Sequence, residues 1–129
     1  ERVRIDSDGN MLMRSGALGY GAGTGGTVTQ ATSKSTTVTL NKPNGVITLN
    51  GAALAAGASV GFQLNNNLLH ANDTVVVNLW STSATIETYR VFVDRVETGY
   101  AWIMIQNYSG VSRSEAFSIK FAIIKGSTT

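Results

Sequence analysis

Apolar and polar residues alternate along most of this chain, which is the pattern of half-buried β-strands. Val60, Phe62 and Leu64 alternate with glycine and polar residues, and residues 117–124 repeat the pattern. Thr, Val, Ile, Gly and Asn dominate, whereas residues that favour helix are few. The one helix-compatible stretch, residues 52–56, spans only about one turn before Gly57, so we expect a turn there.

Turn residues between alternating runs predict two hairpins. Pro43-Asn44-Gly45 separates residues 36–41 from residues 46–50, and Pro followed by Asn-Gly suits a tight turn. Residues 89–96 lead through Glu97-Thr98-Gly99 into residues 100–107, which predicts the second hairpin. The inward positions of the strands predict one core, formed by Val38, Leu40, Ile47, Leu49, Val60, Phe62, Leu64, Val75, Val77, Leu79, Val91, Val93, Ile103, Ile105, Phe117, Ile119, Phe121 and Ile123.

With residues 28–32 as a first edge strand, the chain has about eight strands, and we expect an all-β antiparallel sandwich or jelly roll. Residues 1–26 differ, because they are rich in glycine and have little with which to build a core. We interpret them as a stem or linker, residues 27–126 as the β-sandwich and residues 127–129 as a disordered tail.

Composition narrows the classes of function. The 129 residues, 13.6 kDa in mass, suit one domain. The chain has no cysteine and one histidine, His70, which argues against a disulfide framework and multi-histidine metal sites. The net charge is +2 and only 14% of residues are charged. Without a basic cluster or a long apolar run, we expect no nucleic acid, no membrane insertion, no metal and no cofactor.

The chain begins Glu1-Arg2-Val3 without Met or a signal peptide. We therefore expect a piece from the C-terminal end of a longer protein.

Several large side chains fall on the strand face opposite the predicted core. Tyr100, Trp102 and Met104 alternate with Ala101, Ile103 and Ile105, and Arg90, Phe92, Asp94 and Val96 alternate with the core positions of their own strand. The outer face of a free sandwich is normally polar, so this face is expected to be covered. A subunit interface that uses Trp102, Met104, Phe92 and Val76 is favoured. A sugar-binding platform that uses Trp80, Tyr100 or Trp102 is the alternative.

The most distinctive stretch is Gly-Gly-Thr-Val-Thr-Gln-Ala-Thr-Ser-Lys at residues 25–34, followed by residues 36–49, 54–62, 72–77 and 115–126. Over residues 16–126 the chain resembles the C-terminal domain of tail-fibre and tailspike proteins of tailed bacteriophages and prophages. The resemblance implies a homotrimeric, β-rich tip that joins the rest of the fibre chain and touches the bacterial surface. It also implies synthesis in the bacterial cytoplasm and a final, extracellular place on the virion.

We therefore expect a non-enzymatic domain that attaches to the bacterial host by recognising a cell-surface glycan. The candidate contacts lie near strand ends: Trp80, Tyr100, Tyr108, Asn66, Asn67 and His70. One alternative is a structural trimerisation cap without a ligand. Another is a fragment of a capsule-degrading enzyme that would use carboxylates among Asp73, Glu87, Asp94, Glu97 and Glu115.

Three further motifs resemble functional sites but lack part of the pattern that such sites require. Residues 6–10 contain acidic residues but lack the spacing of a calcium loop, so we expect a plain turn. Residues 21–26 match Gly-x-Gly-x-x-Gly without the flanking strand and helix of a dinucleotide site. His70 is expected to be an ordinary loop histidine, because no nucleophile motif accompanies it.

Overall fold

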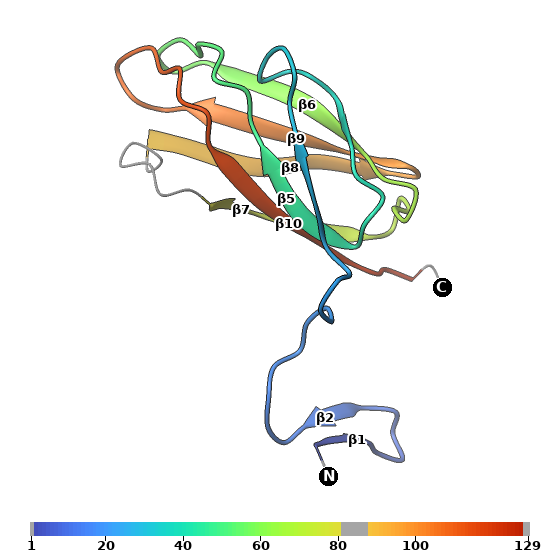
Figure 1. Cartoon of the computed structure of the whole chain (residues 1–129). Helices are drawn as coiled ribbons and strands as arrows, with labels where there is room; N and C mark the ends of the chain where they lie inside the picture. The colour runs from blue at the N-terminus through green and yellow to red at the C-terminus, as the bar shows by residue number, and fades with distance from the viewer. Residues whose placement is uncertain (1, 81–87, 128–129) are drawn as a thin grey trace.

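The computed structural model describes residues 2–80 and 88–127, which form strands and no α-helix (Figure 1). This described part contains no helix with the length and hydrophobicity needed to cross a lipid bilayer. The strands are β1 (Val3–Ile5), β2 (Met11–Met13), β3 (Gly26–Thr29), β4 (Val38–Thr39), β5 (Asn44–Thr48), β6 (Ser59–Asn65), β7 (Thr74–Trp80), β8 (Tyr89–Glu97), β9 (Tyr100–Asn107) and β10 (Ser118–Ile124).

Eight of these strands form two four-stranded sheets that enclose one core. Sheet I has the order β3-β5-β10-β7, and sheet II has the order β4-β6-β9-β8. The all-β, sandwich-like class predicted from the alternation is confirmed. The expectation of purely antiparallel pairing is wrong for two pairs, since β3 runs parallel to β5 and β4 runs parallel to β6.

The hairpin predicted around Pro43-Asn44-Gly45 does not form. Val38 of β4 pairs with Leu64 of sheet II, whereas β5 pairs with β10 and β3 of sheet I. A Cβ atom on Gly45 would lie 2.6 Å from the carbonyl oxygen of Gly26 and 2.7 Å from Leu40 Cδ2. Gly45 is therefore a strand residue that permits close packing between chain segments, and residues 40–43 carry the chain from one sheet to the other.

The second predicted hairpin is confirmed. β8 and β9 pair antiparallel around Gly99, whose φ of 92° suits glycine. The register shifts by one residue between Val93 and Arg95, so Asp94 forms a bulge. This shift corrects the predicted position of Val96, which packs against the core instead of facing outward.

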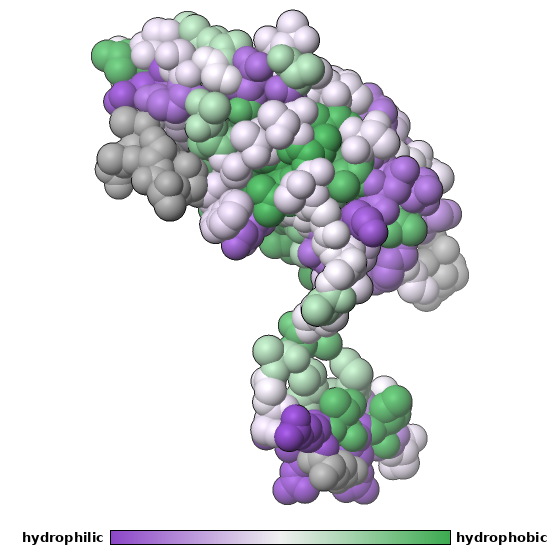
Figure 2. Space-filling view, viewed as in Figure 1, coloured by the Kyte–Doolittle hydropathy of each residue, from purple (hydrophilic) through white to green (hydrophobic). Residues whose placement is uncertain are grey.

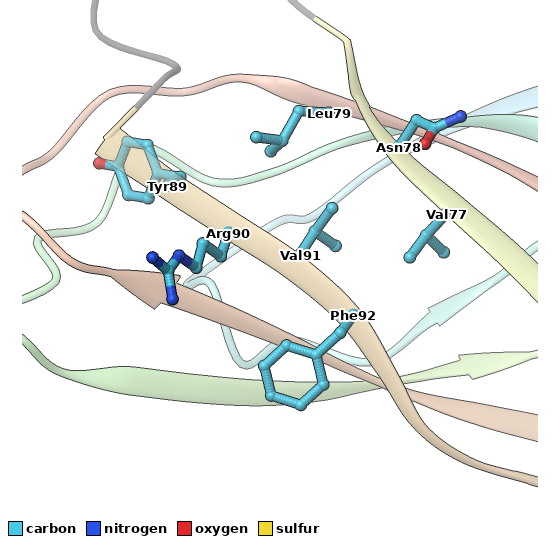
Figure 3. Close-up of a pocket in the computed structure, with 7 residues that line it drawn as sticks. All are labelled: Val77, Asn78, Leu79, Tyr89, Arg90, Val91 and Phe92. Carbon is cyan, nitrogen blue, oxygen red and sulfur yellow. The ribbon is translucent and has the colours of Figure 1, made fainter.

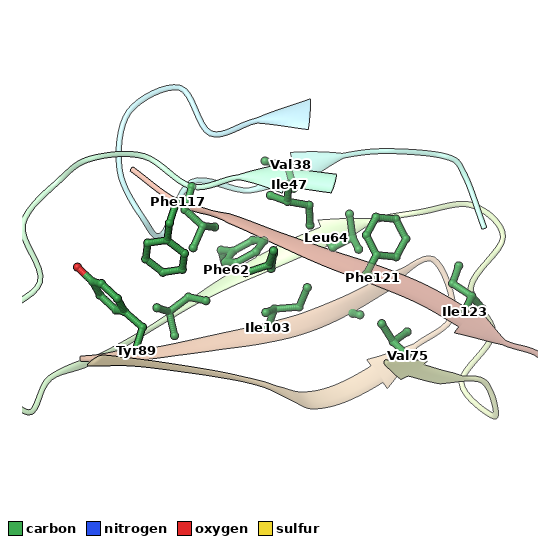
Figure 4. Close-up of a cluster of buried hydrophobic side chains, with 14 of the residues drawn as sticks. Val38, Ile47, Phe62, Leu64, Val75, Tyr89, Ile103, Phe117, Phe121 and Ile123 are labelled. Carbon is green, nitrogen blue, oxygen red and sulfur yellow. The ribbon is translucent and has the colours of Figure 1, made fainter. Parts of the chain in front are cut away.

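The predicted core is confirmed, because every expected residue is either buried or packed against the buried cluster (Figure 4). Phe62, Ile103 and Ile119 have no exposed surface at all. The structure adds buried residues that alternation did not select: Leu54 and Leu69 from loops, Tyr89 at the start of β8, and Ala101. The predicted turn before Gly57 is also present, closed by a hydrogen bond from Ala58 N to Ala55 O of 3.1 Å.

The first two strands form a small hairpin away from the sandwich (Figure 1). Asp6 accepts hydrogen bonds from the backbone N–H groups of Asp8 and Asn10, at 3.0 and 2.9 Å, and Gly9 has a φ of 83°. Residues 6–10 are thus a plain Asx-type turn, as expected.

The sandwich has two distinct ends. At the basal end β3 begins at Gly26, β9 begins at Tyr100 and β10 finishes at Ile124, so the N-terminal segment and the C-terminus leave together (Figure 1). At the far end β7 finishes at Trp80, which pairs with Ser118. A partner that approaches the end opposite the N-terminal segment would therefore meet the side chains of the far end.

Candidate functional site

The large side chains placed outside the core lie on two different surfaces. Trp102, Met104 and Phe92 point outward from sheet II, where Phe92 pairs with Met104. Val76 and Trp80 point outward from β7 of sheet I. The four residues expected at one subunit interface therefore do not share a face, because β7 and β8 belong to different sheets.

Trp102 lies along the surface of sheet II, with its indole over a glycine of the neighbouring strand. A Cβ atom on Gly61 of β6 would lie 2.4 Å from Trp102 Nε1 and 2.7 Å from Met104 Sδ. Only glycine leaves room for the ring at this position. Glycine weakens a strand interior, and an aromatic side chain that covers it restores packing. The result is a half-buried indole held against the sheet instead of standing out from it.

Polar groups surround this ring. The Arg95 guanidinium lies 5.5 Å from the centre of the Trp102 ring and pairs with Asp94 at 3.2 Å. Gln63, directly opposite Trp102, donates a hydrogen bond of 2.8 Å to Asn65 Oδ1. We use the name tryptophan face for the outward residues of this area: Gln63, Asn65, Phe92, Arg95, Tyr100, Trp102 and Met104.

The tryptophan face combines the two chemistries that a sugar requires. An aromatic ring can stack on the apolar C–H face of a pyranose, and amide and guanidinium groups can hydrogen-bond its hydroxyls. Tyr100 adds a phenol between Asn65 of β6 and Glu97 of β8. Of the six residues predicted to contact a ligand, Tyr100 is the one that belongs to this face.

Three predicted ligand contacts lie at the basal end. Asn66 is buried, and its side chain donates to Lys42 O at 2.7 Å and accepts from Leu68 N at 2.9 Å. Its amide is therefore used inside the protein, and Asn66 is corrected to a structural residue. Asn67 and His70 are exposed loop residues in this region, which the chain enters from the N-terminal segment.

Trp80 and Tyr108 lie at the far end, and each has a cation over its ring. Lys120 Nζ is 4.3 Å from the centre of the Trp80 ring, and Arg90 Cζ is 4.4 Å from that of Tyr108. Both rings are about half exposed. Trp80 ends β7 of sheet I, and Tyr108 lies in the loop directly after β9 of sheet II.

An open groove runs between the edge strands β7 and β8, with a volume of about 740 Å³ (Figure 3). Val77, Leu79 and Val91 line it from the core side, while Arg90 and Phe92 lie on the other side of β8. These inward valines and the leucine are only partly buried. Among the described residues, β7 and β8 are not paired with each other as strands along this edge.

Lys34 is a buried lysine that connects loops at the far end. This role was not predicted from the sequence. Lys34 Nζ donates to the carbonyl oxygens of Asn50 and Glu115 and lies 5.5 Å from the centre of the Phe117 ring. Burial lowers the pKa of the Lys34 ammonium, and the charge of Glu115 partly opposes this effect. No local pattern around Lys34 marks it, because its partners are carbonyls distant in the sequence.

Tyr89 completes this cluster by donating a hydrogen bond of 2.7 Å to the Glu115 carboxylate. Burial, together with this hydrogen bond, raises the pKa of Tyr89 far above its ordinary value. Glu115 also lies 3.6 Å from the Arg113 guanidinium. The Glu115 carboxylate is thus held by two partners at the junction of two loops.

The carboxylates considered for glycoside hydrolysis are spread over both ends of the described part of the fold, with Glu97 at the basal end of β8. Asp73 accepts hydrogen bonds from Gly126 N and His70 N at the basal end, whereas Glu115 lies at the far end. Asp94 pairs with Arg95 on the bulge of β8. Glu87 lies outside the described residues. Within residues 2–80 and 88–127, no cluster of three His, Cys, Asp or Glu side chains could hold a metal ion.

Comparison of the chain with protein-family models, with curated proteins and with solved structures gave no match. The site therefore has to be interpreted from its own geometry.

Proposed function

We propose that this chain is a non-enzymatic attachment domain that binds carbohydrate on a bacterial surface, as part of a homotrimeric phage tail fibre or tailspike on the virion. The resemblance of residues 16–126 to such distal domains supports the biological setting. The tryptophan face supports the ligand class, and the Trp102 indole over Gly61 is the observation that carries the proposal.

A ring fixed against the sheet loses little side-chain freedom when a ligand stacks on it. Gln63 and Asn65 already hold each other at 2.8 Å, and Arg95 is positioned by Asp94, so the polar groups around the ring are ordered as well. Because these residues are spread over the outer side of three strands, the site suits a short stretch of polysaccharide better than a single deeply enclosed sugar. Weak binding at each copy would be strengthened by several copies on one particle.

The test measures binding of the full chain to an array of bacterial surface polysaccharides. We expect Trp102→Ala to abolish the binding of any glycan that the wild type retains. Trp80→Ala is the matched control, because it removes the other tryptophan from the outer face of sheet I. Loss of binding in Trp80→Ala alone would place the site at the far end and refute the tryptophan face.

A structural trimerisation cap is the second candidate function, favoured by the exposed apolar residues of the N-terminal hairpin. Under it, the wild type binds no glycan and does not compete with phage for adsorption to host cells. Cleavage of host capsule by the full chain would instead support the enzyme alternative and contradict the proposal.

A further inference from the structure

We propose that copies of this chain associate through the outer face of sheet I together with the apolar side of the β1–β2 hairpin, and not through the tryptophan face. We call this combined area the association surface. Its hairpin part consists of Val3, Ile5, Met11 and Met13, and its sheet part of the outward residues of β3, β5, β10 and β7.

The β1–β2 hairpin exposes apolar side chains that a partner could bury. Val3 pairs with Met13 and Ile5 with Met11, so four apolar side chains project from the same side. All four are exposed, Ile5 to 71%. Figure 2 shows hydrophobic side chains on the surface of this hairpin, below the sandwich. An isolated two-stranded hairpin is marginally stable in water, and one with an open apolar side is stabilised when that side is buried.

The apolar area continues from the N-terminal segment onto sheet I. Leu18, Gly19 and Tyr20 border a hollow of about 420 Å³ against residues 122–125, and the Tyr20 hydroxyl donates to Ile123 O. Leu18 is 78% exposed beside this hollow. From there the surface passes to Ile124 and Ala122, and Ala122 pairs with Val76 of β7. The chain segment between the hairpin and β3 therefore contacts sheet I.

Sheet I lacks the charges that normally keep a sheet surface in water. Its four strands have 4, 5, 7 and 7 residues, and among these 23, all described, Lys120 is the only charged residue. Its ammonium lies over the Trp80 ring at the far end. By contrast, β8 of sheet II has four charged residues among nine, Arg90, Asp94, Arg95 and Glu97. Neither charge, proline nor a bulge protects the long edge strand β7.

The charge distribution identifies the occupant as another copy of this chain. In an interface between copies of one chain, a charge buried in the contact needs an opposite charge from the same chain opposite it. Sheet I has one charged residue, Lys120, so two copies can meet through it with little charge to desolvate, whereas the β8 face would bury four charged residues. A different protein partner would ordinarily be selected by complementary charge, which sheet I does not offer.

The size of the surface agrees with this assignment. The hairpin strands contribute only 3 residues each, which is too few for a stable contact on their own. A specific interface takes about 20–30 residues from each partner. The four hairpin residues, the 13 outward residues of sheet I and the three residues 18–20 that border the hollow beside β10 make 20, at the lower end of that range. Association through this surface leaves the tryptophan face open to a ligand.

This inference deepens the trimeric part of the proposed function by naming the surface involved, and it does not depend on glycan binding. The experiment measures the mass of the full chain by light scattering and sedimentation at about 10 μM protein, where a specific oligomer should persist. The wild type is expected at a small multiple of 13.6 kDa. Ile5→Asp, Val76→Glu and Ile124→Glu are each expected to lower the mass to that of one chain.

Phe92→Glu is the matched control, since Phe92 is 46% exposed on sheet II and Val76 is 42% exposed on sheet I. It should leave the oligomer intact, and a cooperative thermal transition in every variant shows that each has folded. A wild type that is monomeric at this concentration overturns the inference. So does dissociation by Phe92→Glu when Val76→Glu remains associated. An oligomer that binds no glycan leaves this inference standing while it refutes the proposed ligand.

Discussion

Asn107 ends β9 with its side chain turned into the protein, where its Nδ2 group donates to the carbonyl oxygens of Leu54, Ala55 and Val111. The distances are 2.9, 3.1 and 2.8 Å. Its Oδ1 atom accepts from the Ser109 hydroxyl at 2.7 Å. One fully buried amide therefore fixes the two loops of the far end, residues 51–58 and 108–116, to the end of a strand.

Asn107→Ala is expected to destabilise the fold by about 2–3 kcal/mol, because it removes the three hydrogen bonds by which the buried amide joins two loops to the end of β9. Urea unfolding followed by circular dichroism measures the change in the free energy of unfolding. Asn67→Ala, at an exposed loop position, should change it by less than about 0.5 kcal/mol. Equal stability of the Asn107 variant and the wild type would show that water replaces the amide.

The lowered pKa of Asp73 predicts how the stability of the fold depends on pH in acid. Burial alone would raise its pKa, but hydrogen bonds from Lys125, Gly126 N and His70 N outweigh burial and lower the pKa to about 2, from an ordinary value of 3.8. A carboxyl group with a depressed pKa stabilises the fold above its unfolded pKa, and the stabilisation is lost as pH falls through the folded pKa. Stability should therefore decline between about pH 4 and pH 2.

Asp73→Asn should be less stable than the wild type at neutral pH and should lose most of that decline, as measured by thermal melting across the acid range. Asp94→Asn should retain the decline, since Asp94 pairs with Arg95 on the exposed surface. An unchanged acid dependence in Asp73→Asn would assign the effect to other carboxylates.

At the scale of the element, Gly45 shows how tightly the first strands of sheet I pack. Gly45→Ala would place a Cβ atom 2.6 Å from the backbone oxygen of Gly26, so β3 and β5 would have to separate. We expect a loss of about 1–3 kcal/mol in the free energy of unfolding, typical of overpacking. Chemical denaturation measures it. Gly110→Ala has open space around the new atom and should be nearly neutral.

The two predicted hairpins show which elements can be recognised from sequence. Strands β8 and β9 are neighbours along the chain, so alternation and Gly99 were sufficient to predict their pairing. The run around Pro43 has equally good local signals, but β4 pairs with β6 and β5 pairs with β10. Strand pairing between distant segments leaves no local pattern, and nothing near Gly45 distinguishes a turn from a close approach.

The candidate site could be predicted only in part for the same reason. Alternation placed Trp102 and Met104 outside the core, since it needs only the parity of their own strand. It could not show that Trp102 covers Gly61, because β6 and β9 are distant in the sequence. The bulge at Asp94 also reverses the parity of Val96. The burial of the Asn66 amide also leaves no mark in the sequence, where a buried and an exposed asparagine look alike.

At the scale of the molecule, the two outer faces and the two ends have different chemistry. Sheet II has aromatic rings among amides and charges, whereas sheet I is nearly free of charge and borders residues 18–20 of the N-terminal segment. In the two proposals made above, one face binds a polar ligand and the other a copy of the chain. A single sandwich can serve both purposes because each sheet has only one side committed to the core.

The proposed association between copies of the chain predicts a measurable change in the β1–β2 hairpin. Amide hydrogen exchange in β1 and β2 should depend on protein concentration, since burial of Ile5 and Met11 by a second copy stabilises a hairpin that is marginal alone. Mass spectrometry of peptides covering residues 2–14 should show faster exchange on dilution, while residues 100–107 at the centre of sheet II stay protected at every concentration. In Ile5→Asp the hairpin should exchange at the fast rate throughout. Slow exchange in the hairpin that is independent of concentration would mean that it is stabilised within one chain, and the surface on sheet I would then have to act without it.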